Sequence, residues 1–225
     1  MFIPQDYFVA LALMVFSMLC WGSWANTQKV CKQWRFEFYY WDYVWGSLLT
    51  FSLAGITLGR LAPGSPESFF RNLGSADHLH IAFALTSGVI FTLGNLLLVA
   101  AVAVAGLAVA FPVGVGLSLV IGSVLNYFVT PKGNPLLLFG GIAMVSVAIV
   151  LDALAYRSIS ADVKVTIQGV TLSLVAGLGI GVSYPFFAKS IVGQNHLSPY
   201  GAGFLFAIGI LLGALPLNYF LCATR

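Results

Sequence analysis

Seven apolar stretches follow one another through this 225-residue chain, each about long enough to cross a bilayer as a helix. A transmembrane helix needs about 20 predominantly apolar residues. The chain is 60% hydrophobic and only 8% charged, whereas a soluble domain carries about 25% charged residues. We therefore expect an all-α integral membrane protein with seven transmembrane helices. The expected spans are Tyr7–Asn26, Phe38–Leu58, Ile81–Val104, Leu107–Val129, Leu136–Ala155, Val170–Ala188 and Tyr200–Cys222.

The boundaries of these spans carry further information. No Lys or Arg precedes Lys29, and the first apolar run is too long for a signal peptide, so we expect a retained span. The third and fourth spans are separated only by Ala105-Gly106, which predicts a tight helical hairpin. Seven spans place four Lys and Arg residues on the N-terminal side and six on the other, which favours an outside N-terminus. The apolar composition predicts contact with membrane lipid, and the scattered Lys and Arg residues form no basic run that would bind nucleic acid.

A short pattern occurs twice, 160 residues apart. The matched positions are Ser23, Trp24, Lys29 and Tyr40 in the first copy, and Ser183, Tyr184, Lys189 and Tyr200 in the second. Five spans separate the copies, so the second crosses the membrane in the opposite direction. Such inverted repeats are typical of secondary transporters; chance agreement between two helix ends is the alternative.

The repeat predicts how the chain is divided. Residues 1–155 would form a first five-helix repeat, 156–169 a connecting loop, and 170–225 the first two helices of an inverted second repeat. By symmetry three further spans would follow, ending near about residue 320. We expect an incomplete form, with a homodimer whose two copies complete each other as the alternative.

Polar residues within the spans are candidates for function, because burying them in hydrocarbon is unfavourable. Asn95 lies near the middle of the third span and suits a neutral, hydrogen-bonding solute; a contact between helices is its alternative role. Asp42 lies about one turn inside the second span and is a candidate for proton coupling, with a helix-end carboxylate that reaches water as the alternative. Asp152, near the end of the fifth, is better explained as a carboxylate reaching water.

Two further features suggest a binding cavity. Trp21 and Trp24 lie deep in the first span beside small residues, where they either wall a cavity or pack in the core. Pro112 and Pro185 interrupt the fourth and sixth spans and are candidate hinges, with a static kink as the alternative. The candidate substrate-binding residues are Trp21, Ser23, Trp24, Asn95 and Tyr184.

Other patterns exclude chemistry or predict packing. We expect no catalytic set, metal site or cofactor, because the three cysteines show no metal-binding spacing and His78-Leu-His80 lacks further ligands. The cysteines are expected to be buried free thiols. Glycines four residues apart predict close helix contacts rather than a nucleotide loop. These pairs are Gly55/Gly59, Gly177/Gly181 and Gly209/Gly213.

The chain resembles the ureide permease family. The residues that carry the resemblance are Gly22-Ser23-Trp24, Asp42-Tyr43, Gly94-Asn95 and Asn126-Tyr127-Phe128, and it covers about the first 155 residues. The hairpin Ala103–Val115 is similar to the wider drug/metabolite transporter superfamily, and the bacterial glucose/ribose porter branch shares much of the pattern. The chain departs from plant members in lacking their long central loop and in having Ala25 where they often have Pro.

This resemblance implies ten helices in two inverted five-helix repeats, and import of small polar solutes by alternating access. It makes Trp24, Asp42 and Asn95 candidates for substrate or proton contact. We expect a proton-coupled importer of a neutral metabolite, either a ureide such as allantoin or a sugar, in the plasma or inner membrane. The alternatives are an exporter of the same superfamily and a non-transporting truncated form or assembly subunit.

Overall fold

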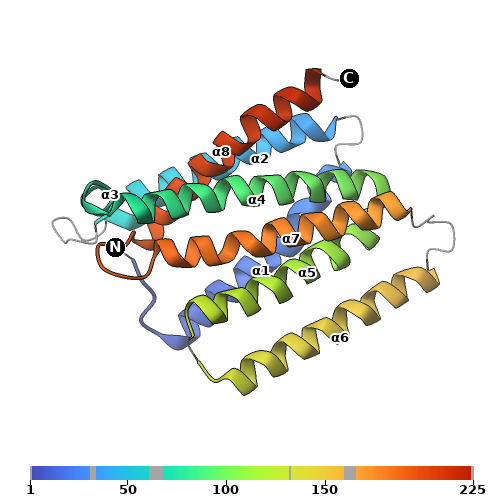
Figure 1. Ribbon diagram of the computed structural model, residues 1–225, viewed down its shortest axis with the longest axis horizontal. Coiled ribbons are helices and arrows are strands. Elements are labelled where there is room, and N and C mark those ends of the chain that lie inside the picture. Colours follow the sequence, from blue (N-terminus) through green and yellow to red (C-terminus); the bar gives the residue numbers. More distant parts are fainter. Residues whose placement is uncertain (1, 31–33, 61–67, 132, 160–165, 224–225) are drawn as a thin grey trace.

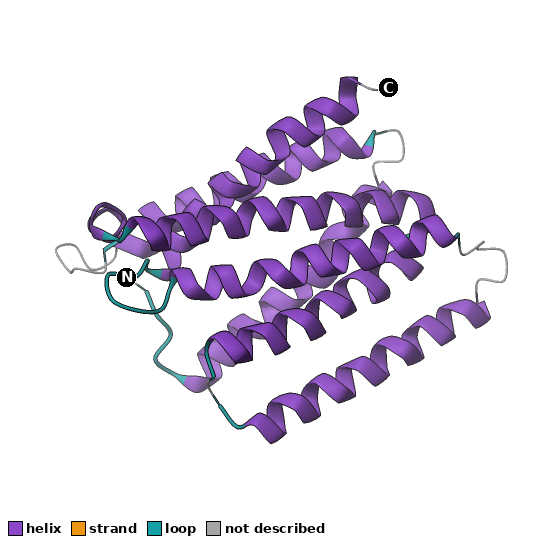
Figure 2. Ribbon diagram, viewed as in Figure 1, coloured by secondary structure: helices purple, strands orange, loops and turns teal. Residues whose placement is uncertain are grey.

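The computed structural model describes residues 2–30, 34–60, 68–131, 133–159 and 166–223, and within these ranges its regular elements are all helical (Figures 1 and 2). The elements are α1 (Tyr7–Val30), α2 (Phe36–Ile56), the 3₁₀ turn η1 (Leu58–Arg60), α3 (Phe69–Ser75), α4 (His78–Ala105), α5 (Leu107–Val129), α6 (Pro135–Ile159), α7 (Ile167–Ser190) and α8 (Pro199–Ala223).

Six of the described helices are long and apolar enough to cross a membrane: α1, α4, α5, α6, α7 and α8. The seventh expected span, α2, has 21 residues, but its first half is rich in Tyr and Trp and contains Asp42, which lowers its hydropathy. The chain is therefore an α-helical, multi-pass integral membrane protein. The expected hairpin is present, because α4 ends and α5 begins around Gly106, whose φ of 77° suits a residue without a side chain.

Helix α7 lies between α4 and α5, as Figure 1 shows, so the two helices of the hairpin are held apart by a segment from much later in the chain. Helices α2 and α8 lie beyond α4, and α6 lies on the outer side of α5. The window Tyr7–Trp24 of α1 contains no buried residue. Cys20 of this helix is a free but exposed thiol, so the expectation that it would be buried is wrong.

Glycines allow α7 to fit between its two neighbours. A Cβ atom added to Gly177 would lie 2.6 Å from the Gly114 carbonyl oxygen of α5, and one on Gly181 would lie 2.9 Å from the Ile121 side chain. A Cβ on Gly179, on the opposite side of α7, would lie 3.0 Å from Gly94 Cα of α4. All three positions are tighter than normal carbon contacts. The prediction that Gly177 and Gly181 mark a close helix contact is confirmed.

The other two glycine pairs also face close neighbours. Gly209 approaches the α4 backbone at Gly88, where an added Cβ would lie 3.0 Å from Gly88 Cα. A Cβ on Gly213 would lie 3.1 Å from the Thr92 side chain. Gly55 instead faces the Phe69 ring of α3, and so its pair with Gly59 accommodates an aromatic side chain rather than a helix backbone.

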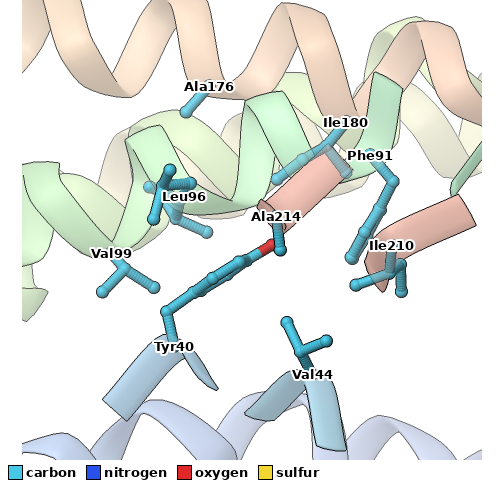
Figure 3. Close-up of a cluster of buried hydrophobic side chains, with 10 residues drawn as sticks. Tyr40, Val44, Phe91, Leu96, Val99, Ala176, Ile180, Ile210 and Ala214 are labelled. Carbon is cyan, nitrogen blue, oxygen red and sulfur yellow. The ribbon is translucent and has the colours of Figure 1, made fainter. Parts of the chain in front are cut away.

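The largest buried cluster lies where α2, α4, α7 and α8 meet (Figure 3). Tyr40 reaches from α2 into this cluster and is fully buried, as Val44 one turn later is. Its hydroxyl donates a long hydrogen bond of 3.5 Å to the Thr92 carbonyl oxygen of α4. Tyr40 is therefore a core residue, although it belongs to the aromatic first half of α2.

Two polar side chains fasten the connection between α7 and α8 to the rest of the protein. The Asn72 amide of α3 donates to the His196 carbonyl oxygen (3.0 Å) and accepts from the Ser198 N–H (2.6 Å). The two ring nitrogens of His80 lie 2.9 Å from the Lys189 carbonyl oxygen and 3.1 Å from that of Gln194. His78 and His80 therefore lie in the first turn of α4 rather than in a loop, and His80 has a structural role.

Candidate solute-binding cavity

A cavity of about 620 Å³ lies between α1 and the helices α2, α4, α7 and α8. Each helix presents residues about one turn apart, so that one stripe of each faces the same space. The lining residues are Ser17, Cys20, Trp21, Trp24, Tyr43, Gly46, Ser47, Thr50, Phe51, Ser87, Phe91, Ser183, Tyr184, Phe187, Phe206 and Ile210. We call this space the central cavity.

The chemistry of the central cavity is aromatic and uncharged. Among the described residues that line it, none is Asp, Glu, Lys, Arg or His. Its wall contains ring pairs, including Trp21 with Phe91 at 6.1 Å and Trp24 with Tyr43 at 5.4 Å between ring centroids. Aromatic faces of this kind bind planar rings and apolar sugar faces. The lack of charge disfavours an ionic solute, whose desolvation would not be compensated.

One hydrogen-bond donor in this wall is unused. The indole nitrogen Nε1 of Trp24 is buried and has no hydrogen-bond partner among the described residues. The neighbouring hydroxyl groups already donate to backbone carbonyls: Ser87 to Ser183 (2.8 Å), and Ser183 to Ile180 (2.7 Å). A buried donor without a partner is unfavourable. A solute carbonyl or hydroxyl oxygen would satisfy the Trp24 N–H.

A second cavity of about 500 Å³ lies between α1, α5 and α7. Its lining comprises Ser17, Met18, Trp21, Val115, Ser118, Leu119, Gly122, Ser123, Asn126, Ile180, Tyr184, Phe187, Ala188 and Ile191. We call this space the side cavity. It too has no Asp, Glu, Lys, Arg or His among its described lining residues, and its one amide side chain is that of Asn126.

Three of the five expected substrate-binding residues line these cavities. Trp24 faces the central cavity, and Trp21 and Tyr184 face both cavities. Ser23 does not: it is exposed and its hydroxyl donates to the Leu19 carbonyl oxygen of its own helix at 2.7 Å. The structure places Ser183, its partner in the repeat, in the cavity wall instead.

Asn95 lies outside both cavities. It is fully buried, and neither its amide nitrogen nor its amide oxygen has a hydrogen-bond partner among the described residues. The Tyr40 hydroxyl is near enough for an electrostatic interaction with it. The preceding Gly94 packs against α7, where a Cβ would lie 2.6 Å from the Ile180 nitrogen. Asn95 is therefore enclosed in the helical core rather than exposed to a cavity.

The remaining candidates do not line either cavity. Asp42 is exposed on α2, next to Tyr43 of the cavity wall, and Asp152 is exposed on α6. Pro112 lies inside α5 and Pro185 inside α7. Pro185 directly follows Tyr184, so a bend of α7 at this point would act on a residue of both cavities. The binding, hinge and proton-coupling roles of these residues stay predictions.

Several lining residues were missed from the sequence. The candidate substrate-binding residues lie on the first, third and sixth expected spans, but α2 and α8 also contribute to the central cavity. On α2, Tyr43, Ser47 and Thr50 recur at three- and four-residue intervals along one face. That periodicity was visible in the sequence and could have identified them. Asn126 entered only as part of a resemblance, although its polar side chain lies inside an apolar span.

Comparison with known proteins identifies the family. The sequence model of the Ureide permease family matches residues 39–177. Ureide permease 1 of Arabidopsis thaliana is 31% identical over 162 residues, which are 71% of this chain and 41% of that protein. Ureide permease 2 of the same plant is 30% identical over 173 residues, covering 75% of this chain and 44% of that protein.

A third relative, Probable ureide permease A3 of Vigna unguiculata, is 29% identical over 158 residues, covering 68% of this chain and 42% of that protein. The chain thus spans about two fifths of the length of these relatives. No solved structure matches it. The match of the family model over more than half of the chain agrees with the resemblance seen in the residues, and the chain belongs to the ureide permease family.

Proposed function

We propose that the central cavity binds a neutral ureide, and that the protein moves this solute across the membrane by alternating access. The observation that carries the proposal is the uncharged aromatic wall with the unpartnered Trp24 N–H. A ureide has a compact, uncharged body, carbonyl oxygens that accept hydrogen bonds, and N–H groups that donate them. The relatives named ureide permeases support this choice of solute class.

The size of the central cavity suits such a solute. Small-molecule sites in proteins typically have volumes of about 300–1,000 Å³, and this cavity has about 620 Å³. A sugar is the second candidate, because its apolar face also stacks on aromatic rings and its hydroxyl groups also accept from Trp24. The family membership favours the ureide.

We propose that the seven long helices comprise one five-helix repeat over residues 1–155 and, after the connection 156–169, the first part of an inverted repeat over 170–225. Two observations support this arrangement. Seven helices have 21 or more residues, and the matched pairs at Trp24 and Tyr184 supply side chains to the same cavity. In this proposal α2 crosses the membrane with its polar aromatic half packed against protein, as Tyr40 is. The protein would reside in the plasma or inner membrane.

The native thiol of Cys20 provides a direct binding assay, because it lines the central cavity and is exposed. A protein carrying Cys31→Ser and Cys222→Ser retains Cys20 as its single thiol. In proteoliposomes, allantoin should slow alkylation of Cys20 and should also be taken up. Glucose at the same concentration should do neither if the solute is a ureide.

A matched substitution tests the proposed contact. Trp24→Phe keeps an aromatic ring but removes the donor, and loss of one hydrogen bond of about 1 kcal/mol should raise the allantoin concentration that half-protects Cys20 about fivefold. The proposal of a ureide site would be overturned if allantoin neither protected Cys20 nor crossed the membrane. Protection by glucose alone would establish the sugar instead.

Proton coupling by Asp42 is a separate proposal, based on the position of this exposed carboxylate beside Tyr43. An imposed pH gradient should accelerate allantoin uptake by the native protein, and Asp42→Asn should abolish the acceleration while leaving protection of Cys20 intact. Asp152→Asn is the matched control and should retain the gradient response. Full gradient dependence in Asp42→Asn would refute this role, and solute efflux rather than uptake would indicate an exporter.

A further inference from the structure

We propose that the side cavity is a second binding station for the same neutral solute, with Asn126 as its polar contact and Tyr184 as the partition between the two stations. This inference rests on the proposed function of the central cavity. The two spaces share part of their walls: Ser17, Trp21, Tyr184 and Phe187 line both of them. The two cavities therefore adjoin each other.

The side cavity has an unused polar group of its own. The Asn126 side-chain oxygen Oδ1 is buried and has no hydrogen-bond partner among the described residues. Ser118, also in this wall, already donates to the Val115 carbonyl oxygen of its own helix at 2.7 Å. The unused acceptor would pair with an N–H group of the solute. The central cavity thus offers a donor at Trp24 and the side cavity an acceptor at Asn126, and an amide or urea group complements both.

The partition residue packs against a glycine of α5. The edge of the Tyr184 ring lies against Gly122 of α5, where an added Cβ would point at Cδ2 and lie 3.1 Å from Cε2 and 3.3 Å from Cγ of the ring. No side chain of α5 at this position locks the ring in place. Pro185, the next residue, lacks the N–H of a regular helix and permits α7 to bend there. A bend at Pro185 would shift the Tyr184 ring relative to Trp21 and connect the two cavities.

The position of the side cavity gives its place on the route. Asn126 lies within one turn of the end of α5 at Val129, and Ile191 caps the end of α7. Both helices run in the same direction in Figure 1, so the side cavity extends toward the membrane face where they end. The side cavity therefore lies beside the central cavity and extends farther toward that face, so a solute could enter or leave through it.

The test compares two single-thiol proteins in proteoliposomes with allantoin as the probe. One retains Cys20 in the central cavity. The other carries Ser123→Cys in the side cavity, with the native cysteines replaced by serine. Allantoin should slow alkylation of both thiols. Adding Asn126→Leu should raise the half-protecting concentration about fivefold at the Ser123→Cys thiol, because about 1 kcal/mol is lost with one hydrogen bond, and less than twofold at Cys20.

Ser146→Ala on α6, outside both cavities, is the control and should change neither value, since its hydroxyl donates to the Ile142 carbonyl oxygen of its own helix at 2.8 Å. Protection at Cys20 in each variant also reports that the protein has folded. If Asn126→Leu does not fold, Asn126→Thr, whose side chain is shorter, is used in its place. Protection at Cys20 without protection at Ser123→Cys would overturn the second station and leave the proposed function standing. An equal shift at both thiols in Asn126→Leu would also overturn it. Lack of protection at both thiols would instead reject the ureide site itself.

Discussion

Gly94→Ala tests whether the close contact of α4 and α7 holds this membrane protein together. The new Cβ would lie 2.6 Å from the Ile180 nitrogen and 2.8 Å from the Ala176 carbonyl oxygen. Carbon contacts are optimal at about 3.5–4.0 Å. Both neighbours are backbone atoms of a helix and cannot rotate away, so α4 and α7 must separate by roughly 1 Å at this level.

The expected loss follows from this geometry. Overpacking of a well-packed core destabilises by about 1–3 kcal/mol, whereas replacing Gly by Ala inside a helix stabilises by about 1 kcal/mol. Gly141→Ala on α6 shows the gain in helix propensity without overpacking, because an added Cβ there meets no atom within 4 Å. Both variants gain the same helix propensity, so the difference between them should be about 1–3 kcal/mol in the free energy of unfolding.

The measurement is reversible unfolding in mixed micelles, with both variants and the native protein prepared in the same detergent. Gly179→Ala, whose Cβ would lie 3.0 Å from Gly94 Cα, should fall between the other two. If Gly94→Ala were as stable as Gly141→Ala, the reasoning that glycines set the distance between α4 and α7 would be refuted.

Three further substitutions test other parts of the structure. Asn72→Leu removes both hydrogen bonds that hold the α7–α8 connection, and should destabilise by about 2–3 kcal/mol; a loss below about 0.5 kcal/mol in micelle unfolding would contradict the pairing. His80→Phe should lose about 1–3 kcal/mol by the same assay, because the polar contacts of the ring nitrogens with the carbonyl oxygens of Lys189 and Gln194 are lost; unchanged stability would argue against that role. Pro185→Ala restores an N–H to α7 and should slow allantoin uptake several-fold without lowering stability, and uptake at the native rate would exclude the hinge.

The sequence alone was sufficient to identify the helices and the solvent that surrounds them. A bilayer provides no hydrogen-bond partners for the backbone, so an apolar stretch of about 20 residues must form a helix whatever its neighbours are. The helix ends at Gly106 and the close contacts at Gly177 and Gly181 were also predictable, because they depend on the absence of a side chain at a given residue. One expected span, α2, is less apolar than the six candidate spans. It has polar aromatic residues where it packs against protein, as Tyr40 shows.

Which polar side chains face a cavity was decided only by the tertiary structure. Asn95 and Asn126 both place an amide within an apolar helix, yet the first is fully buried away from both cavities and the second lines the side cavity. Likewise Ser23 is exposed while Ser183 lies in the central wall. A sequence fixes the spacing of side chains along one helix, but the direction in which each points depends on how that helix is rotated and on which helix packs against it. Here that neighbour is α7, a segment distant in sequence from both α4 and α5, which fits between them because its glycines lack side chains on both sides.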